Sequence, residues 1–143
     1  MIDLDYAMLA DYAAIQDSKL TVVGASFTRV LVDQVPMQAF LAVAGRARCD
    51  EPDRQDIGLT VRVISPGEEP LVIEATNRLD ASEEVHPPYL GHKRGIIFAV
   101  QIAIPLLTTG TYTVEVDIDE TEGVDRTLKF EAACLDQAQD SER

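Results

Sequence analysis

Apolar and polar side chains alternate along several short segments of this chain. The clearest segment covers residues 111–118, where every second residue, beginning with Tyr112, is apolar. Successive side chains of a strand point to opposite faces, so this pattern predicts a strand with one buried face and one hydrated face. The same alternation occurs in residues 57–63, 71–75 and 128–132.

Two other segments, 37–47 and 96–104, are apolar at nearly every position. A strand with two apolar faces is covered on both sides, so these segments are predicted as central strands. One face would pack on the opposing sheet, and the other on loops or on a partner. Residues 20–26 are expected to form a further strand, entered through the polar turn 16–19.

Short breaks with turn chemistry separate the predicted strands. Ser65, Pro66 and Gly67 combine a fixed φ with a residue that tolerates positive φ, which closes a hairpin. Glu122 and Gly123 play the same part before the last strand. These signals give about eight strands, and eight apolar residues are expected to share one core: Tyr112, Val114, Val116, Leu59, Val61, Ile73, Phe98 and Phe130.

Two segments allow a helix as well as a strand. In residues 4–15 the alanines suit a helix, whereas the alternation of Leu4, Tyr6 and Met8 suits a strand, which we favour. Residues 95–114 run for 20 positions without a charge, about the length of a membrane-spanning helix. Because Pro105 and Gly110 interrupt many β-branched residues, a strand, a turn and a second strand are predicted there instead.

The fold class that follows is an all-β, immunoglobulin-like sandwich of about eight mostly antiparallel strands. The pattern Gly110-x-Tyr112-x-Val114, preceded by Pro105, is similar to a strand entry found in many immunoglobulin-like sandwiches. That similarity implies that the Tyr112 hydroxyl bonds to the backbone at a corner of the fold, which is a structural role. Residues 1–136 are expected to form one domain and residues 137–143 a polar, disordered tail.

The charge balance narrows the classes of partner. The chain of 143 residues carries 25 acidic and 12 basic side chains, for a net charge of −13. Nucleic-acid binding needs a basic surface that displaces counterions from phosphates, so no nucleic-acid partner is expected. The first residues lack the basic and apolar stretches of a secretory signal. Cys49 and Cys134 have no paired spacing, so both are predicted to be thiols in a cytoplasmic protein without a membrane partner.

A resemblance to a known group of proteins rests on the opening of the chain. Residues 5–13, Asp-Tyr-Ala-Met-Leu-Ala-Asp-Tyr-Ala, are followed at 19–24 by Lys-Leu-Thr-Val-Val-Gly. This arrangement resembles the start of a family of small uncharacterised bacterial β-domain proteins. The resemblance implies a compact β domain in a bacterial cytoplasm. It implies no activity and no functional residues.

Two acidic segments offer carboxylates for metal binding or catalysis. The hairpin 117–125 begins like a calcium-binding loop with Asp117 and Asp119, but its glycine falls one position late and Leu128 stands where the loop needs a glutamate. A solvated hairpin tip is favoured, and cation binding there stays open. Residues 50–56 are interpreted as a polar loop, since paired carboxylates catalyse only in a cleft. No catalytic residue, metal ligand or cofactor is predicted.

Residues 86–94 form the most distinctive stretch, His-Pro-Pro-Tyr-Leu-Gly-His-Lys-Arg. In an acidic chain, a basic pair beside two histidines and an aromatic residue suits a partner-binding epitope. The predicted epitope consists of His86, Tyr89, His92, Lys93 and Arg94. The competing interpretation is an ordinary connection in which the basic pair offsets Glu83 and Glu84.

Two functions therefore stay open. The favoured one is a non-catalytic cytoplasmic domain that binds an unknown protein partner, self-associates or is structural. The alternative is a small ligand-binding or enzymatic sandwich with its site in the loop 80–95.

Overall fold

The structure is a computed structural model that describes residues 1–135. Its described residues form the following strands: β1 (Ile2–Ala10), β2 (Tyr12–Gln16), β3 (Lys19–Val23), β4 (Arg29–Val32), β5 (Met37–Cys49), β6 (Asp56–Ile64), β7 (Val72–Asp80), β8 (Arg94–Leu106), β9 (Gly110–Ile118) and β10 (Arg126–Cys134). The prediction of an all-β chain is confirmed. The predicted tail 137–143 lies outside the described residues.

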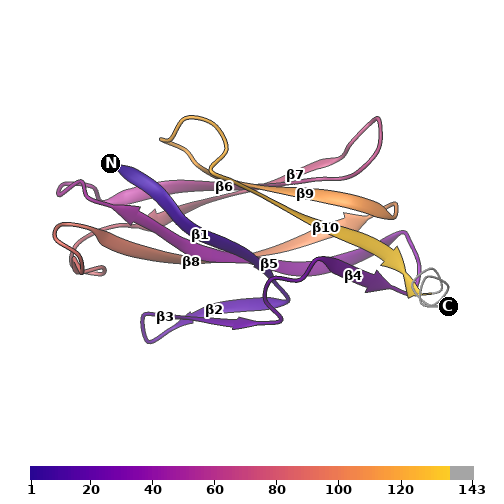
Figure 1. Ribbon diagram of the computed structural model, residues 1–143, viewed down its shortest axis with the longest axis horizontal. Coiled ribbons are helices and arrows are strands. Elements are labelled where there is room, and N and C mark those ends of the chain that lie inside the picture. The colour runs from indigo at the N-terminus through magenta and orange to yellow at the C-terminus, as the bar shows by residue number, and fades with distance from the viewer. Residues whose placement is uncertain (136–143) are drawn as a thin grey trace.

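The strands form two large sheets and one small hairpin (Figure 1). One sheet has the order β1-β5-β8, and the other has the order β4-β10-β9-β6-β7. Pairing is antiparallel throughout these sheets except between β4 and β10, which run parallel. Strand β4 was not predicted, because a four-residue segment carries too little pattern of its own.

One hydrophobic core joins the facing sides of the two large sheets. Seven of the eight predicted core residues are buried in it, whereas Ile73 is half-buried. Ile73 belongs to β7, which pairs with β6 on one side and forms an edge of its sheet. Its partial exposure is therefore a consequence of the edge position.

The small hairpin covers the outer face of the β1-β5-β8 sheet. Ala13 of β2 and Val22 of β3 pack against Ala42, Ala44 and other small side chains there. This arrangement explains why β5 and β8 are apolar on both faces, as predicted. The strand preference for residues 4–15 is confirmed and the helix alternative is wrong, because β1 and β2 are consecutive strands separated at Asp11.

The predicted turns also occur. Gly67 lies at φ +110° between the paired strands β6 and β7, and Gly123 lies at φ +71° between β9 and β10. The strand predicted at 20–26 ends at Val23, because Gly24 and Ser26 both adopt positive φ. Residues 95–114 form parts of β8 and β9, and no helix within residues 1–135 is long and apolar enough to cross a membrane.

Candidate binding site

A cleft of about 610 Å³ lies beneath the connection 81–93, and we call it the loop cleft. Three parts of the fold enclose it: the tip of the β2–β3 hairpin, the outer face of the β5–β8 pair, and the end of β7 with the following connection. The side chains that line it include Ile15, Arg46, Arg78, Val85, His86, Tyr89 and Ile97. The loop cleft is thus built from segments that lie far apart in the sequence.

Local hydrogen bonds hold the connection 81–93 in place. The backbone N–H of Ser82 donates to the Asp80 carboxylate at 2.9 Å, which lowers the pKa of Asp80 below its usual 3.8. The N–H of His86 then donates to the carbonyl of Ser82 at 2.9 Å. At the other end, the N–H of Tyr89 donates to the carbonyl of Lys93 at 3.0 Å. His86 and Tyr89 are therefore presented by a connection that is tied at both ends.

Arg46 forms the centre of a stack at the floor of the loop cleft. Its guanidinium carbon lies 5.3 Å from the ring centre of Tyr6 and 5.6 Å from that of Tyr89. Arg46 Nε also donates to the Asp5 carboxylate at 2.8 Å, and this hydrogen bond lowers the pKa of Asp5 from its usual 3.8. Asp5 thus neutralises the Arg46 guanidinium, and the contact of Arg46 with the Tyr89 ring helps to fix the position of that ring.

The structure brings together two of the five predicted epitope residues, His86 and Tyr89, in the loop cleft. His92 and Lys93 are exposed on the adjoining turn, where Gly91 has φ +64° and the N–H of Lys93 donates to the carbonyl of Leu90 at 3.1 Å. Lys93 lines a different hollow, beside Met1 and Asp50. Whether these four residues bind a partner stays a prediction.

The prediction that Arg94 contributes to an exposed positive patch is wrong, because Arg94 is only 1% exposed. Its guanidinium donates to the carbonyls of Glu51 and Pro52 and lies 3.3 Å from the Cys49 sulfur. Its Nε has no hydrogen-bond partner among the described residues. Arg94 therefore ties the connection 50–55 to the start of β8 and presents no charge to a partner.

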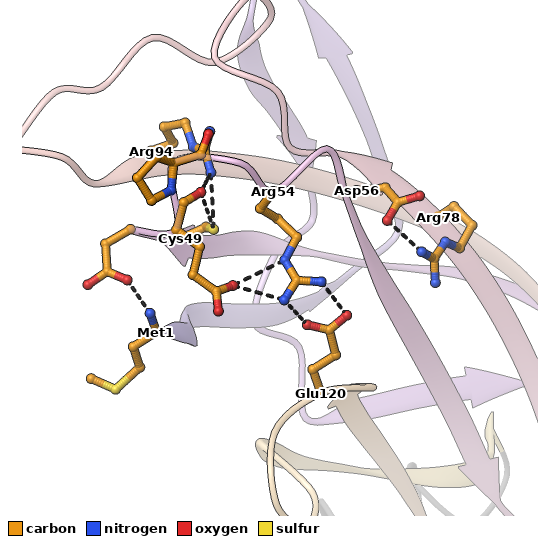
Figure 2. A network of polar contacts seen from close by, with 10 residues as sticks. Met1, Cys49, Arg54, Asp56, Arg78, Arg94 and Glu120 are labelled. Carbon is orange, nitrogen blue, oxygen red and sulfur yellow. Dashed lines mark hydrogen bonds and ion pairs between the residues drawn. The ribbon is translucent and has the colours of Figure 1, made fainter.

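Figure 2 shows Arg94 within a wider set of polar contacts at this end of the molecule. Arg54 bridges two connections by pairing with Glu51 at 2.9 Å and with Glu120 at 2.5 Å. Arg78 at the end of β7 pairs with Asp56 of β6 at 2.6 Å. These charged groups are occupied in joining loops and strands, which matches a structural role.

The acidic hairpin 117–125 spreads its carboxylates among separate partners. Asp125 accepts from the N–H of Ile118 and from the hydroxyl of Thr121, each at 2.7 Å. Asp119 accepts from the hydroxyl of Thr60 on β6 at 3.0 Å. Across residues 1–135, no three His, Cys, Asp or Glu side chains are grouped to hold a metal ion.

Comparison with known proteins gives one family. Residues 5–131 match the sequence model of a family of unknown function, DUF6941. The chain belongs to the DUF6941 family. This membership agrees with the expected resemblance to an uncharacterised family, whereas the bacterial source and the opening motif stay predictions. None of the curated proteins matches this DUF6941 chain.

One solved structure with a similar fold is Pseudomonas fluorescens alkylpurine DNA glycosylase AlkC bound to DNA containing an abasic site analog. The match has a TM-score of 0.50 at 10% sequence identity, and covers 92% of the DUF6941 chain. The same match covers 30% of the glycosylase chain, so the DUF6941 domain corresponds to a minor part of that protein. At this identity the likeness concerns the fold alone.

Sequence reasoning missed the cleft residues that come from strands. Arg46 carried a visible signal, since it and Arg48 are the two charged residues of the largely apolar β5. Ile15 and Ile97 looked like ordinary strand residues, and their place in the loop cleft depends on how the hairpin docks. Long-range packing of this kind leaves no local pattern.

Proposed function

We propose that this DUF6941 domain is a non-catalytic cytoplasmic recognition domain that binds a protein partner at the loop cleft. The observation that carries the proposal is the group of exposed apolar side chains around the cleft: Ile15, Val85 and Tyr89 are each about half exposed, at 49%, 52% and 53%. Exposed aromatic and aliphatic side chains beside a preformed cleft are typical anchors of protein interfaces. An apolar side chain of the partner would enter between the hairpin tip and the ring of Tyr89.

The restricted connection supports this proposal. Pro87 and Pro88 limit the backbone before Tyr89, and the Arg46 stack holds the tyrosine ring. A surface that is ordered before binding loses less conformational entropy when the partner arrives. Exposed His92 and Lys93 on the neighbouring turn would favour an acidic segment of the partner at the rim.

The test is capture of partners from the native host by the tagged domain and by two variants. Tyr89→Ala should lose a specific partner that the wild-type domain retains. Phe40→Ala is the matched control, since Phe40 is 74% exposed but lies on β5 outside the loop cleft. If both variants retain the same proteins as the wild type, the loop cleft is not the partner site.

Binding of a small molecule in the same cleft is the second candidate. Its volume of about 610 Å³ falls within the roughly 300–1,000 Å³ common for ligand sites. A metabolite that raises the melting temperature of the wild type but not of Tyr89→Ala would favour this candidate, because a ligand of the folded state stabilises it. If no compound in a metabolite library raises the melting temperature of the wild type, the small-molecule candidate is rejected.

Nucleic acid is not included in the proposal. The glycosylase with the similar fold is bound to DNA, but a net charge of −13 repels phosphates. Fluorescence anisotropy with a labelled duplex at low salt is expected to show no binding. Binding that weakens with salt would contradict this expectation.

The immunoglobulin-like assignment of the fold is also proposed. It is supported by two sheets with the orders β1-β5-β8 and β4-β10-β9-β6-β7, which place strands in the manner of a sandwich with Greek-key connections. It is further supported by Tyr112, whose hydroxyl donates to the carbonyl of Thr108 at 2.8 Å. An experimental structure should reproduce this strand order and the Tyr112 contact, and a different order would overturn the assignment.

A further inference from the structure

We propose that two copies of this chain pair through β7, so that the five-stranded sheets of both copies join into one continuous sheet. This inference goes beyond the recognition function at the loop cleft, because it concerns the edge of a sheet and a second copy of the same chain. It starts from the edge position of β7, which pairs with β6 and with no other strand among the described residues.

Strand β7 carries charged side chains but lacks three other features that protect a sheet edge: a bulge, a proline and a short length. Its nine residues pair with β6 in an unbroken register, without a bulge. It contains neither proline nor lysine. By contrast, β1 has a register shift between Leu4 and Tyr6, the edge strand β4 is only four residues long, and the edge strand β8 contains Pro105. A long and regular edge strand is a template for another strand.

The backbone groups available at this edge belong to the even-numbered residues. The N–H of Ser65 donates to the carbonyl of Leu71, and the N–H of Ala81 donates to the carbonyl of Gln55, both at 2.9 Å. Both bonds continue the β6–β7 register, so odd-numbered residues direct their backbone groups toward β6. Because these directions alternate in an antiparallel pair, Val72, Glu74, Thr76, Arg78 and Asp80 direct their N–H and C=O groups outward.

The side chains of β7 match an antiparallel copy of the same strand. With Thr76 opposite Thr76 of the second copy, Glu74 lies opposite Arg78 of the second copy, and the reverse pair forms by symmetry. Thr–Thr pairs and opposite charges are favourable neighbours across antiparallel strands. Thr76 is also the midpoint of β7, so this register pairs the whole strand.

The neighbouring registers are less favourable. A two-fold axis at Glu74 or at Arg78 would set two like charges directly opposite each other. An axis at Asn77 would set Glu74 opposite Asp80 of the second copy. Like charges in opposed positions destabilise a strand pair. An axis at Ala75 brings no like charges together, but it sets Arg78 opposite Val72 and Glu74 opposite Thr76. Of these registers, the one centred on Thr76 sets Glu74 directly opposite Arg78, so opposite charges favour it.

Existing ion pairs would extend across the new interface. Within one copy, Glu74 pairs with Arg62 at 2.8 Å and Arg78 pairs with Asp56 at 2.6 Å. In the paired sheet the order Arg62, Glu74, Arg78 of the second copy and Asp56 of the second copy alternates in sign. On the inner face, half-buried Ile73 would lie opposite Leu79 of the second copy and shield the open side of the core.

Sedimentation equilibrium of the full chain at about 0.15 M salt tests the proposal, since the net charge of −13 opposes association when screening is weak. The wild type should form a dimer. Glu74→Arg and Arg78→Glu each replace two attractive pairs by two repulsive pairs, and each should weaken the dimer roughly tenfold or more. Lys129→Glu, at an exposed position of β10, is the matched control for charge reversal and should leave the dimer unchanged.

Mixing the two charge variants gives the decisive comparison. A chain with Glu74→Arg and a chain with Arg78→Glu have complementary edges, so their mixture should form a heterodimer although each alone is monomeric. Thr76→Pro removes an N–H that points away from β6, and it should give a folded monomer. Far-UV circular dichroism checks that each variant is folded.

Three results would overturn the proposal: a wild type that stays monomeric, a dimer that survives Thr76→Pro and both single charge variants, or a mixture that does not associate. Arg78 also lines the loop cleft, whereas Glu74 does not. A partner lost from Tyr89→Ala but retained by Glu74→Arg would therefore separate the loop-cleft function from self-association.

Discussion

At the scale of single residues, Phe130 is the side chain on which the core depends most clearly. It is 1% exposed, and its ring stacks on Tyr112 at 5.2 Å and meets Phe27 edge-on at 6.0 Å. Phe130→Ala should lower the free energy of unfolding by about 3–5 kcal/mol, because it removes a large buried ring and leaves a cavity. Urea denaturation measures this loss. Phe40→Ala, at an exposed site, should change stability by about 0.5 kcal/mol or less.

Asp5 predicts how stability depends on pH. Its hydrogen bond with Arg46 lowers the pKa of the folded-state carboxyl below 3.8, so the folded protein favours the ionised form more than the unfolded chain does. The stabilisation is present above the unfolded-state pKa and is lost as the pH falls through the folded-state pKa. Asp5→Asn should therefore be less stable than the wild type at pH 7, and the difference should shrink below about pH 4.

Urea denaturation of both proteins between neutral and acidic pH measures this difference. Asp33→Asn, at an exposed position after β4, is the control and should follow the wild type throughout. A difference between Asp5→Asn and the wild type that stays constant with pH would show that Asp5 acts through packing and not through its charge.

At the scale of elements, the close approach of β1 to β5 depends on Gly45. A Cβ at this position would lie 2.1 Å from the carbonyl oxygen of Tyr6 and 2.8 Å from the Phe98 ring. Gly45→Ala should therefore destabilise the fold by about 1–3 kcal/mol, the usual cost of overpacking a core. Gly95→Ala is the control, since its nearest neighbour is the flexible Arg46 side chain at 3.1 Å. If Gly45→Ala and Gly95→Ala have the same melting temperature, this explanation is wrong.

The same elements show how far the sequence predicts this fold. Alternation alone predicted β6, β9 and β10, because every second residue of a strand with one buried face is apolar. It could not predict that β4 lies parallel to β10, since that pairing depends on a connection that crosses between the sheets. It also left open what covers the outer face of β5, which is the β2–β3 hairpin.

The candidate site was likewise predicted only in part. His86 and Tyr89 stood out because their connection has an unusual composition, and both line the loop cleft. Arg94 was wrongly predicted to be exposed, although its position in the sequence indicates a buried side chain. It shares the parity of Ile96 and Phe98, which point into the core, so β8 carries the Arg94 side chain inward. A basic pair suggests an exposed patch only where the chain is not already a strand.

At the scale of the whole molecule, the long axis separates the two cysteines. Cys49 pairs in register with Ile2, close to the N-terminus, whereas Cys134 ends β10 next to Val32 (Figure 1). The N-terminus and the end of β10 lie toward opposite ends of the molecule in this view. A disulfide requires Cα atoms within about 7 Å, so this fold does not allow the two residues to bond to each other.

Both cysteines should therefore be thiols in the protein as isolated, in agreement with the proposed cytoplasmic location. Protein purified without reductant and then denatured should titrate with two reactive thiols, one for each cysteine in the sequence. Without denaturant, Cys49 should react slowly, because its side chain is 0% exposed. If the denatured protein has no reactive thiol and its mass is lower by two hydrogens, the cysteines are joined. That result would contradict both the proposed cytoplasmic location and the separation of the ends of β5 and β10.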